Sequence, residues 1–189
     1  HVLLAVEGDR VIGRSYRIDF AMGEDLERPG LPDDGWDAIV LWAYLDGLQG
    51  RAPTHTSALE IAIRPEQRGT GLAAAMIRAM CDEAAAGGFT DLYAPVRPSR
   101  KTEEPDTPMG EYVSRVREDG LPFDPWLRTH ARLGAEIVGV CPAAMTISGT
   151  LEDWREWTGL PFDRSGPVHV PGALVPVHVS LEHDHAVYV

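Results

Sequence analysis

The sequence lacks asparagine and has only two cysteines, Cys81 and Cys141, among its 189 residues. Two cysteines cannot build a disulfide framework, so we predict a structural role for each and a reducing environment. Basic residues are also scarce, with 17 against 29 acidic ones and a net charge of −12. A nucleic-acid-binding protein needs a basic surface, and an anionic membrane repels an acidic protein, so this balance argues against both partners.

No hydrophobic run is long enough for a membrane helix and no signal peptide is recognisable, so we predict a cytoplasmic protein. Hydrophobic residues make up 44% of the chain, which is enough for a core. The length suits one domain over residues 1–189, with residues 142–189 as its C-terminal extension. The chain opens at His1 and stops at Val189 within strand-like sequence, so we expect residues beyond both ends.

Residues 57–88 hold the most informative pattern of the sequence. Leu59–Ile63 alternates apolar residues with others, which predicts a strand that Pro65 ends. A glycine-containing turn follows at residues 68–73. From Leu72 the chain is rich in alanine, with apolar residues at helical spacing. We therefore predict a helix there, which ends at a pair of glycines.

A strand, a glycine turn and a helix together can bind an anion. The first amides of a helix have no partner within it, and the helix dipole adds partial positive charge. Glycine lets a pyrophosphate approach the backbone closely, and Arg68 adds a full charge. The alternative is a helix start that merely tolerates glycine. We predict a phosphate site on Arg68 and on the backbone of Gly69, Thr70, Gly71, Leu72 and Ala73.

The turn matches neither of two common nucleotide-binding motifs. No Gly-Lys-Ser/Thr follows, which excludes a Walker loop, and Gly-x-Gly-x-x-Gly is absent. The order Arg-x-x-Gly-x-Ala, at Arg68, Gly71 and Ala73, instead resembles the acetyl-CoA loop of the GNAT N-acyltransferase superfamily. The resemblance covers residues 1–20 and 57–140. It implies an α/β (α+β) fold with a mixed, mostly antiparallel central sheet flanked by helices, and acetyl-CoA as co-substrate without a metal.

The segments before this turn predict a hairpin and an additional helix. Val2–Val6 and Val11–Phe20 are typical of two strands joined at Gly8-Asp9. By resemblance these are the second and third strands of a GNAT domain, in which a first strand and two helices usually come earlier. Residues 34–47 predict a helix that looks like an insertion before the cofactor strand. Either it shapes substrate choice, with Trp36 touching substrate, or it is a packing helix or a homodimer surface.

Positive charge gathers after the next predicted strand, at residues 90–95. In the GNAT arrangement this strand and the cofactor strand splay apart, and the acyl thioester lies between them. Arg97, Arg100 and Lys101 form the densest positive cluster of the chain. Either they contact a CoA phosphate or an anionic acceptor, or they belong to a solvated loop. The family often has asparagine here to hold the pantetheine arm, and Ser99 is the nearest polar substitute.

Two helices after this loop carry the candidate proton donors. We predict the first at residues 109–118 and the second at residues 126–133, with Asp124 as its cap. By resemblance, His130 occupies the position of a family tyrosine that often protonates the leaving thiolate. Histidine can do this because its pKa lies near neutrality. The alternative is a histidine on a polar helix face, and Tyr112 is the second candidate acid.

The rest of the sequence predicts short elements and no metal site. His183 and His185 flank Asp184, but two histidines at this spacing lack a third fixed ligand. Trp154 and Trp157 share a helix face, and we expect them in the core. We predict strands at 135–140, 145–148, 176–181 and 186–189, and a helix at 151–157 capped by Thr150 with Asp153.

By resemblance, the reaction is direct attack of a primary amine of a small molecule on the acetyl-CoA thioester. A backbone amide of Ile61, Ala62 or Ile63 would polarise the thioester carbonyl. Glu60 on the same strand is the candidate base, unless it only faces solvent. Two other functions stay open: a non-catalytic acyl-CoA sensor or interaction domain with the GNAT fold, and an unrelated α/β nucleotide-binding protein.

Overall fold

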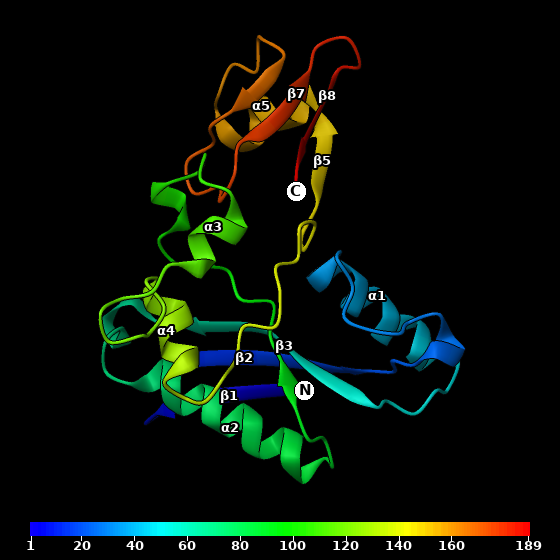
Figure 1. Cartoon of the computed structure of the whole chain (residues 1–189), viewed down its shortest axis with the longest axis vertical. Coiled ribbons are helices and arrows are strands. Elements are labelled where there is room, and N and C mark those ends of the chain that lie inside the picture. Colours follow the sequence, from blue (N-terminus) through cyan, green and yellow to red (C-terminus); the bar gives the residue numbers. More distant parts are fainter. The chain divides into compact units, whose positions relative to one another are not determined.

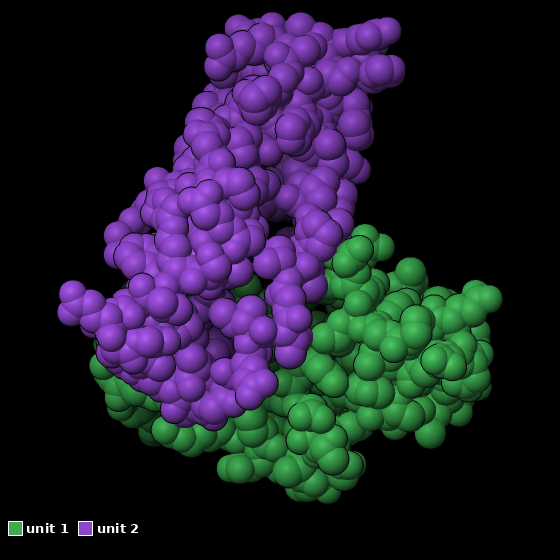
Figure 2. All heavy atoms as spheres, viewed as in Figure 1, with its two compact units in different colours: residues 1–96 green, residues 97–189 purple.

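The computed structural model describes all 189 residues. They form two compact units, residues 1–96 and residues 97–189, which Figure 2 distinguishes by colour. Each unit contains its own four-stranded sheet. None of the helices combines the length and the hydrophobicity that a membrane crossing needs.

The sheet of the first unit has the strand order β1-β2-β3-β4, of which Figure 1 labels the first three strands. Strand β2 pairs antiparallel with both β1 and β3, whereas β3 and β4 are parallel. This confirms the predicted hairpin and the mixed, mostly antiparallel sheet. The strands are β1 (Val2–Glu7), β2 (Arg10–Phe20), β3 (His55–Ile63) and β4 (Leu92–Tyr93).

Helix α2 (Leu72–Ala86) packs on one face of this sheet, as the helical spacing predicts. Gly13 on β2 allows the helix to come close, because a Cβ at this position would lie 2.8 Å from the sulfur of Met76. The helix is followed by Gly87, whose amide donates to a carbonyl of the last turn. Its buried side chains are Met76, Ile77, Met80 and Ala84.

Helix α1 (Gly35–Leu48) confirms the helix predicted at residues 34–47. It packs through Trp42, whose ring centroid lies 6.1 Å from that of Phe20. Phe20 and Gly13 are an odd number of residues apart in β2, so α1 and α2 contact opposite faces of the sheet. Tyr44 on this helix is 63% exposed. The loop before α1 contains the short helix η1 (Glu24–Leu26).

The second unit ends in a sheet with the strand order β5-β8-β7-β6. Its elements are β5 (Ile147–Thr150), α5 (Leu151–Thr158), β6 (Gly166–Val168), β7 (Val177–Ser180) and β8 (His185–Tyr188). β7 and β8 are antiparallel, as predicted for the last two strands. Thr150 and Asp153 form the predicted capping box of α5. The core of this part consists of Leu151, Trp154, Phe162, Val177, Val179, Ala186 and Tyr188.

Two short helices precede that sheet. Helix α3 (Met109–Ser114) ends four residues before its predicted end at residue 118, because Arg115 takes an extended backbone conformation. Helix α4 (Pro125–Ala131) begins after Asp124, whose side chain accepts hydrogen bonds from the amides of Trp126 and Leu127, as predicted for a cap.

Three strand predictions need correction. Residues 135–140 form no strand, and Val138 is 75% exposed, because no neighbouring segment supplies the hydrogen bonds that a strand requires. The strand predicted at 90–95 forms only over the two residues of β4, and Pro95 beyond it cannot donate to a ladder. The strand predicted at 145–148 forms at 147–150 instead.

The prediction that both tryptophans lie in the core is wrong for Trp157. This residue is 55% exposed, although Trp154 lies in the core as expected.

Candidate active site

The turn before α2 presents a row of amides without protein partners. Gly71 occupies the N-cap position, no side chain caps the helix, and its first turn contains no acidic residue. The amides of Leu72, Ala73 and Ala74 belong to this first turn and have no partner within the helix. No hydrogen bond engages the amides of Gly69, Thr70 and Gly71 either. Six consecutive amides can therefore receive an anion.

The charge around this turn is positive, although the chain as a whole is acidic. Arg68 lies directly before the glycines in an extended conformation, is exposed and forms no ion pair. The neighbouring carboxylate of Glu66 is paired with Arg10 at 3.3 Å. The Thr70 hydroxyl donates to the Gln67 carbonyl at 2.7 Å, which holds the turn that begins with the short helix η2 (Pro65–Gln67). The turn thus offers one free guanidinium beside six open amides.

Strand β3 extends well beyond its partner β4. The two strands pair only at Thr56 and Ser57, which lie opposite Leu92 and Tyr93. A register shift also interrupts the pairing of β2 with β3 in this region. From residue 58 onward, β3 therefore has a strand neighbour on the β2 side alone, as the splayed arrangement predicts.

Alternation along β3 decides which amides are open. The Arg64 amide donates to the Ile12 carbonyl of β2 at 3.0 Å. Backbone amides alternate in direction along a strand, so in this part of the ladder the amides of residues an even number of positions before Arg64 also point at β2. The amide of Ala62 is therefore directed at β2. The amides of Ile61 and Ile63 point to the other side, where β4 has already ended. Of the three predicted amides, these two have no strand partner.

Glu60 lies on β3, where its carboxylate accepts a hydrogen bond from Arg14 Nε at 2.9 Å. Both side chains are about half exposed, at 53% for Arg14 and 44% for Glu60. The Arg14 guanidinium also lies over the Tyr16 ring at 5.7 Å, and its hydrogen bond to Glu60 raises the pKa of Arg14. Glu60 is thus accessible but already paired, and its role as base stays a prediction.

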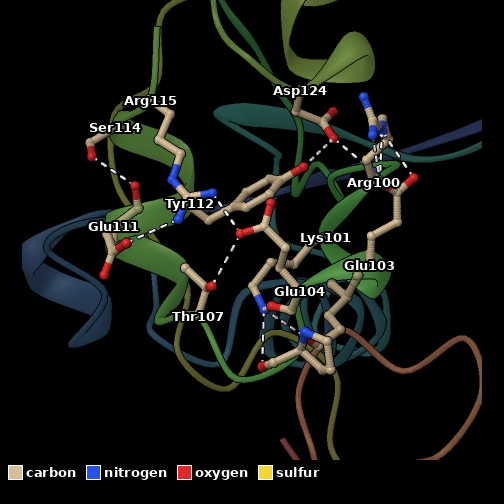
Figure 3. A network of polar contacts seen from close by, with 12 residues as sticks. Arg100, Lys101, Glu103, Glu104, Thr107, Glu111, Tyr112, Ser114, Arg115 and Asp124 are labelled. Carbon is tan, nitrogen blue, oxygen red and sulfur yellow. Dashed lines mark hydrogen bonds and ion pairs between the residues drawn. The ribbon is translucent and has the colours of Figure 1, made fainter.

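Tyr112 on α3 is buried and hydrogen-bonded to Asp124. Its hydroxyl donates to Asp124 Oδ2 at 3.0 Å, and each side chain is 1% exposed (Figure 3). Burial, together with the hydrogen bond to Asp124, raises the pKa of Tyr112 to about 12. Burial alone would raise the pKa of Asp124, but hydrogen bonds from backbone amides, that of Arg100 foremost, hold it below its usual value.

His130 on α4 has a buried nitrogen without a partner. Its Nε2 is inaccessible to solvent and makes no hydrogen bond. The ring packs edge-on against Trp126, with 4.7 Å between the ring centroids. Burial lowers the pKa of His130, so the imidazole is neutral at pH 7. This one nitrogen is withdrawn from water although the residue is only half-buried, and the role of His130 stays a prediction.

The predicted positive cluster has partners within the second unit. Arg97 donates to the Gly172 carbonyl and lies 3.5 Å from the Tyr188 hydroxyl. Arg100 is paired with Glu103 at 2.6 Å. Both arginines are exposed, and their roles in substrate binding stay predictions.

Lys101 differs from these arginines because it is 0% exposed. It opens the short helix η3 (Lys101–Glu103), and its ammonium donates to the carbonyls of Glu104, Pro105 and Leu174. Burial lowers its pKa. The alternative of a solvated loop is therefore wrong at this residue, whose charge serves the local structure.

The predicted residues fall into one group in each unit. The first unit brings together the amide turn, Arg68 and the open edge of β3, and also contains Trp36, which is half-buried at the start of α1. The second unit joins Tyr112, Ser99 and Arg100 around Asp124. Sequence reasoning identified Asp124 only as a cap. Nothing in the local pattern indicates that distant donors converge on it.

Several known proteins are similar to this chain. Residues 31–105 match the model of the acetyltransferase (GNAT) family. Arginine N-acetyltransferase avaD of Aspergillus versicolor is 33% identical over an alignment of 179 residues, and the match covers 84% of this chain and 62% of that protein. The chain thus spans less than two thirds of the length of this relative.

A solved structure also resembles the fold. The loading GNATL domain of CurA from Lyngbya majuscula aligns with a TM-score of 0.58 and 23% identity. The alignment covers 72% of this chain and 63% of that domain's chain. At this level of identity the similarity bears on the fold alone.

Proposed function

We propose that this chain is an enzyme of the GNAT acetyltransferase family that transfers an acyl group from acetyl-CoA, or a related short acyl-CoA, to a primary amine of a small molecule. The amine nitrogen attacks the thioester carbonyl, the carbon–sulfur bond breaks, and the proton lost by the amine ends on the CoA thiol. The relative named above acts on arginine, so arginine is the first acceptor to test.

The observation that carries this proposal is the uncapped start of α2. A helix of 15 residues has its N-terminal dipole directed at solvent with neither a side-chain cap nor an acidic residue to offset it. A diphosphate there accepts several charge-assisted hydrogen bonds from amides that otherwise bond only to water. Arg68 supplies the one full positive charge at this place. The proposal therefore puts the CoA diphosphate on residues 69–74.

The open edge of β3 supports the second step of the proposal. The amides of Ile61 and Ile63 face the side where β4 is absent, so they can donate to the pantetheine arm and to the thioester oxygen. An amide directed at the developing oxyanion contributes on the order of 10²–10³ in rate in other acyl-transfer enzymes. We assign this task to one of these two amides and not to that of Ala62.

Proton transfer falls to Glu60 and His130 in this proposal. Glu60 removes a proton from the ammonium form of the acceptor, directly or through water, so that the free amine can attack, because it is an accessible carboxylate on the cofactor strand. His130 is neutral, so it can protonate the leaving thiolate only after it has itself taken a proton. The lowered pKa of His130 suits this order of proton transfers, because the imidazolium gives its proton up readily. Tyr112 is less suited, since its hydroxyl donates to Asp124.

Thermal-shift measurements with acetyl-CoA, ATP and NAD, followed by an assay of CoA-thiol release with a panel of amines, test the function. We expect acetyl-CoA alone to raise the melting temperature, and thiol release to depend on the amine. Stabilisation by acetyl-CoA without release from any amine would favour the acyl-CoA sensor. Stabilisation by ATP or NAD but not by acetyl-CoA would contradict both and favour another nucleotide-binding protein.

A further inference from the structure

We propose that Asp124 is a positioning residue for His130, because one buried carboxylate anchors the helix that carries this imidazole. The inference rests on the proposed function insofar as His130 transfers a proton. Asp124 itself contacts no substrate in this account. It acts through α4 and through the ring of Trp126.

Four strong hydrogen bonds converge on this carboxylate from three parts of the second unit. Oδ1 accepts from the amides of Trp126 at 2.8 Å and Leu127 at 3.1 Å. Oδ2 accepts from the amide of Arg100 at 2.9 Å and from the hydroxyl of Tyr112 at 3.0 Å. Figure 3 shows the Tyr112 hydroxyl directed at Asp124. One oxygen thus caps α4, while the other ties this cap to α3 and to the segment before η3.

A carboxylate suits this position because every neighbouring polar group donates to it. Asp124 is 1% exposed, and a buried charge is costly unless several donors compensate it. The Ser99 hydroxyl lies 3.4 Å from both oxygens and adds a weaker fifth donor. An asparagine would turn its NH₂ group towards either the helix amides or the Arg100 amide, leaving donors opposite donors. The negative charge therefore matches a set of groups that all donate.

The link from Asp124 to His130 is short. Helix α4 has seven residues, and an isolated helix of this length is marginal in water, so its conformation depends on its cap. Trp126 and His130 are four residues apart on one side of the helix and meet edge-on at 4.7 Å. No ion pair or hydrogen bond orients the buried Nε2 of His130. The position of this ring is thus set by the helix backbone and by Trp126, whose amide Asp124 holds.

A purely structural cap would stabilise the protein without affecting the imidazole, so the test needs a direct readout of His130. NMR titration of the ring protons gives its pKa in the whole chain, with the signal assigned by comparison with His130→Gln. The variants are Asp124→Asn and Asp124→Ser, of which the second keeps a good cap but removes Oδ2. Asp153→Asn is the matched control, because Asp153 is also a carboxylate at a helix start, in the capping box of α5.

We expect both Asp124 variants to bring the pKa of His130 back towards its ordinary value, whereas Asp153→Asn leaves it unchanged. In the assay of thiol release, kcat should fall by up to about 100-fold, the cost of a misplaced catalytic group, with KM for acetyl-CoA unaltered. Trp126→Leu leaves the carboxylate in place and should produce the same change at His130, which keeps the test decisive if the Asp124 variants do not fold.

The inference is overturned if the His130 titration in folded Asp124 variants, or in Trp126→Leu, matches that of the wild type. Failure of the proposed function has a different signature. A wild-type protein that releases no thiol with any amine refutes the enzyme, while the NMR comparison still decides whether Asp124 positions the imidazole.

Discussion

Tyr112 donates its hydroxyl proton to Asp124 Oδ2 over 3.0 Å, with both side chains buried. Burial and this hydrogen bond raise the pKa of Tyr112 to about 12, so one of the five tyrosines should ionise well above the ordinary value. An ultraviolet absorbance titration of the folded protein measures this, and Tyr112→Phe should remove the last step. A titration in which every tyrosine ionises near pH 10 contradicts the buried contact.

The same contact predicts a loss of stability in alkali. The folded-state pKa of Tyr112 is raised, so its contribution is complete below the unfolded value near 10 and disappears as the pH rises through about 12. Denaturant unfolding between these limits should show a falling free energy of unfolding. Tyr112→Phe should be less stable at neutral pH and show a weaker dependence in this range.

Because of His130, we expect the free energy of unfolding to fall as the pH is lowered into the acid range. Its folded-state pKa is lowered by burial, so the unfolded chain takes up the proton first as the pH falls below the ordinary value near 6.5. The free energy of unfolding should therefore decrease with falling pH, by no more than about 1.4 kcal/mol per pH unit for this one proton. His130→Gln should flatten the curve in this range. An equally steep curve in the variant would show that other groups cause the loss.

Replacement of His130 should also slow acyl transfer. A positioned proton-transfer group contributes roughly 10²–10⁴ in rate, so we expect a loss of kcat in this range for His130→Gln, with acetyl-CoA binding retained. His169→Gln is the control, because His169 is exposed in the same unit and pairs only with Asp106 at 2.8 Å. Equal activity in the two variants would remove His130 from the mechanism.

Gly71 and Gly134 allow a matched test of the amide turn. Both have a φ of +90° and open space around the position of a Cβ, but only Gly71 opens α2. Alanine should cost each site roughly 1–2 kcal/mol of stability, because this conformation is unfavourable for L-residues. Calorimetry should then show weaker acetyl-CoA binding for Gly71→Ala alone, since its methyl group projects where the diphosphate binds. Similar affinities in the two variants would argue against this location.

Local signals predicted much of the fold correctly. The hairpin at Gly8-Asp9, the strand–turn–helix unit around Gly71, and the caps at Asp124 and Thr150 each depend on residues close together in the sequence. The wrong predictions concern contacts between residues that are far apart in the sequence. Residues 135–140 have the apolar pattern of a strand, but a strand forms only where a neighbour is available.

In the candidate site, too, the parts formed by neighbouring residues were predictable and the parts formed by distant residues were not. The amide turn and Arg68 form a continuous segment, so its chemistry was predictable from order and spacing. The partners of Arg97 are 75 and 91 residues away, and no local pattern indicates them. The burial of Lys101 on the Leu174 carbonyl is likewise invisible in a sequence where lysine suggests solvent. Asp124 combines both cases, as a predictable cap with an unpredictable set of distant donors.

The central claim is that open amides at the start of α2 hold the CoA diphosphate. Its most direct test follows the backbone amide resonances while acetyl-CoA is added to the wild type and to Arg68→Glu, with Arg78→Glu as a control that makes the same charge change farther along α2. We predict that the largest shifts fall on residues 69–74, that Arg68→Glu weakens binding about 10- to 100-fold, and that Arg78→Glu leaves it unchanged. Saturation with acetyl-CoA that leaves these six amides unmoved would contradict the claim.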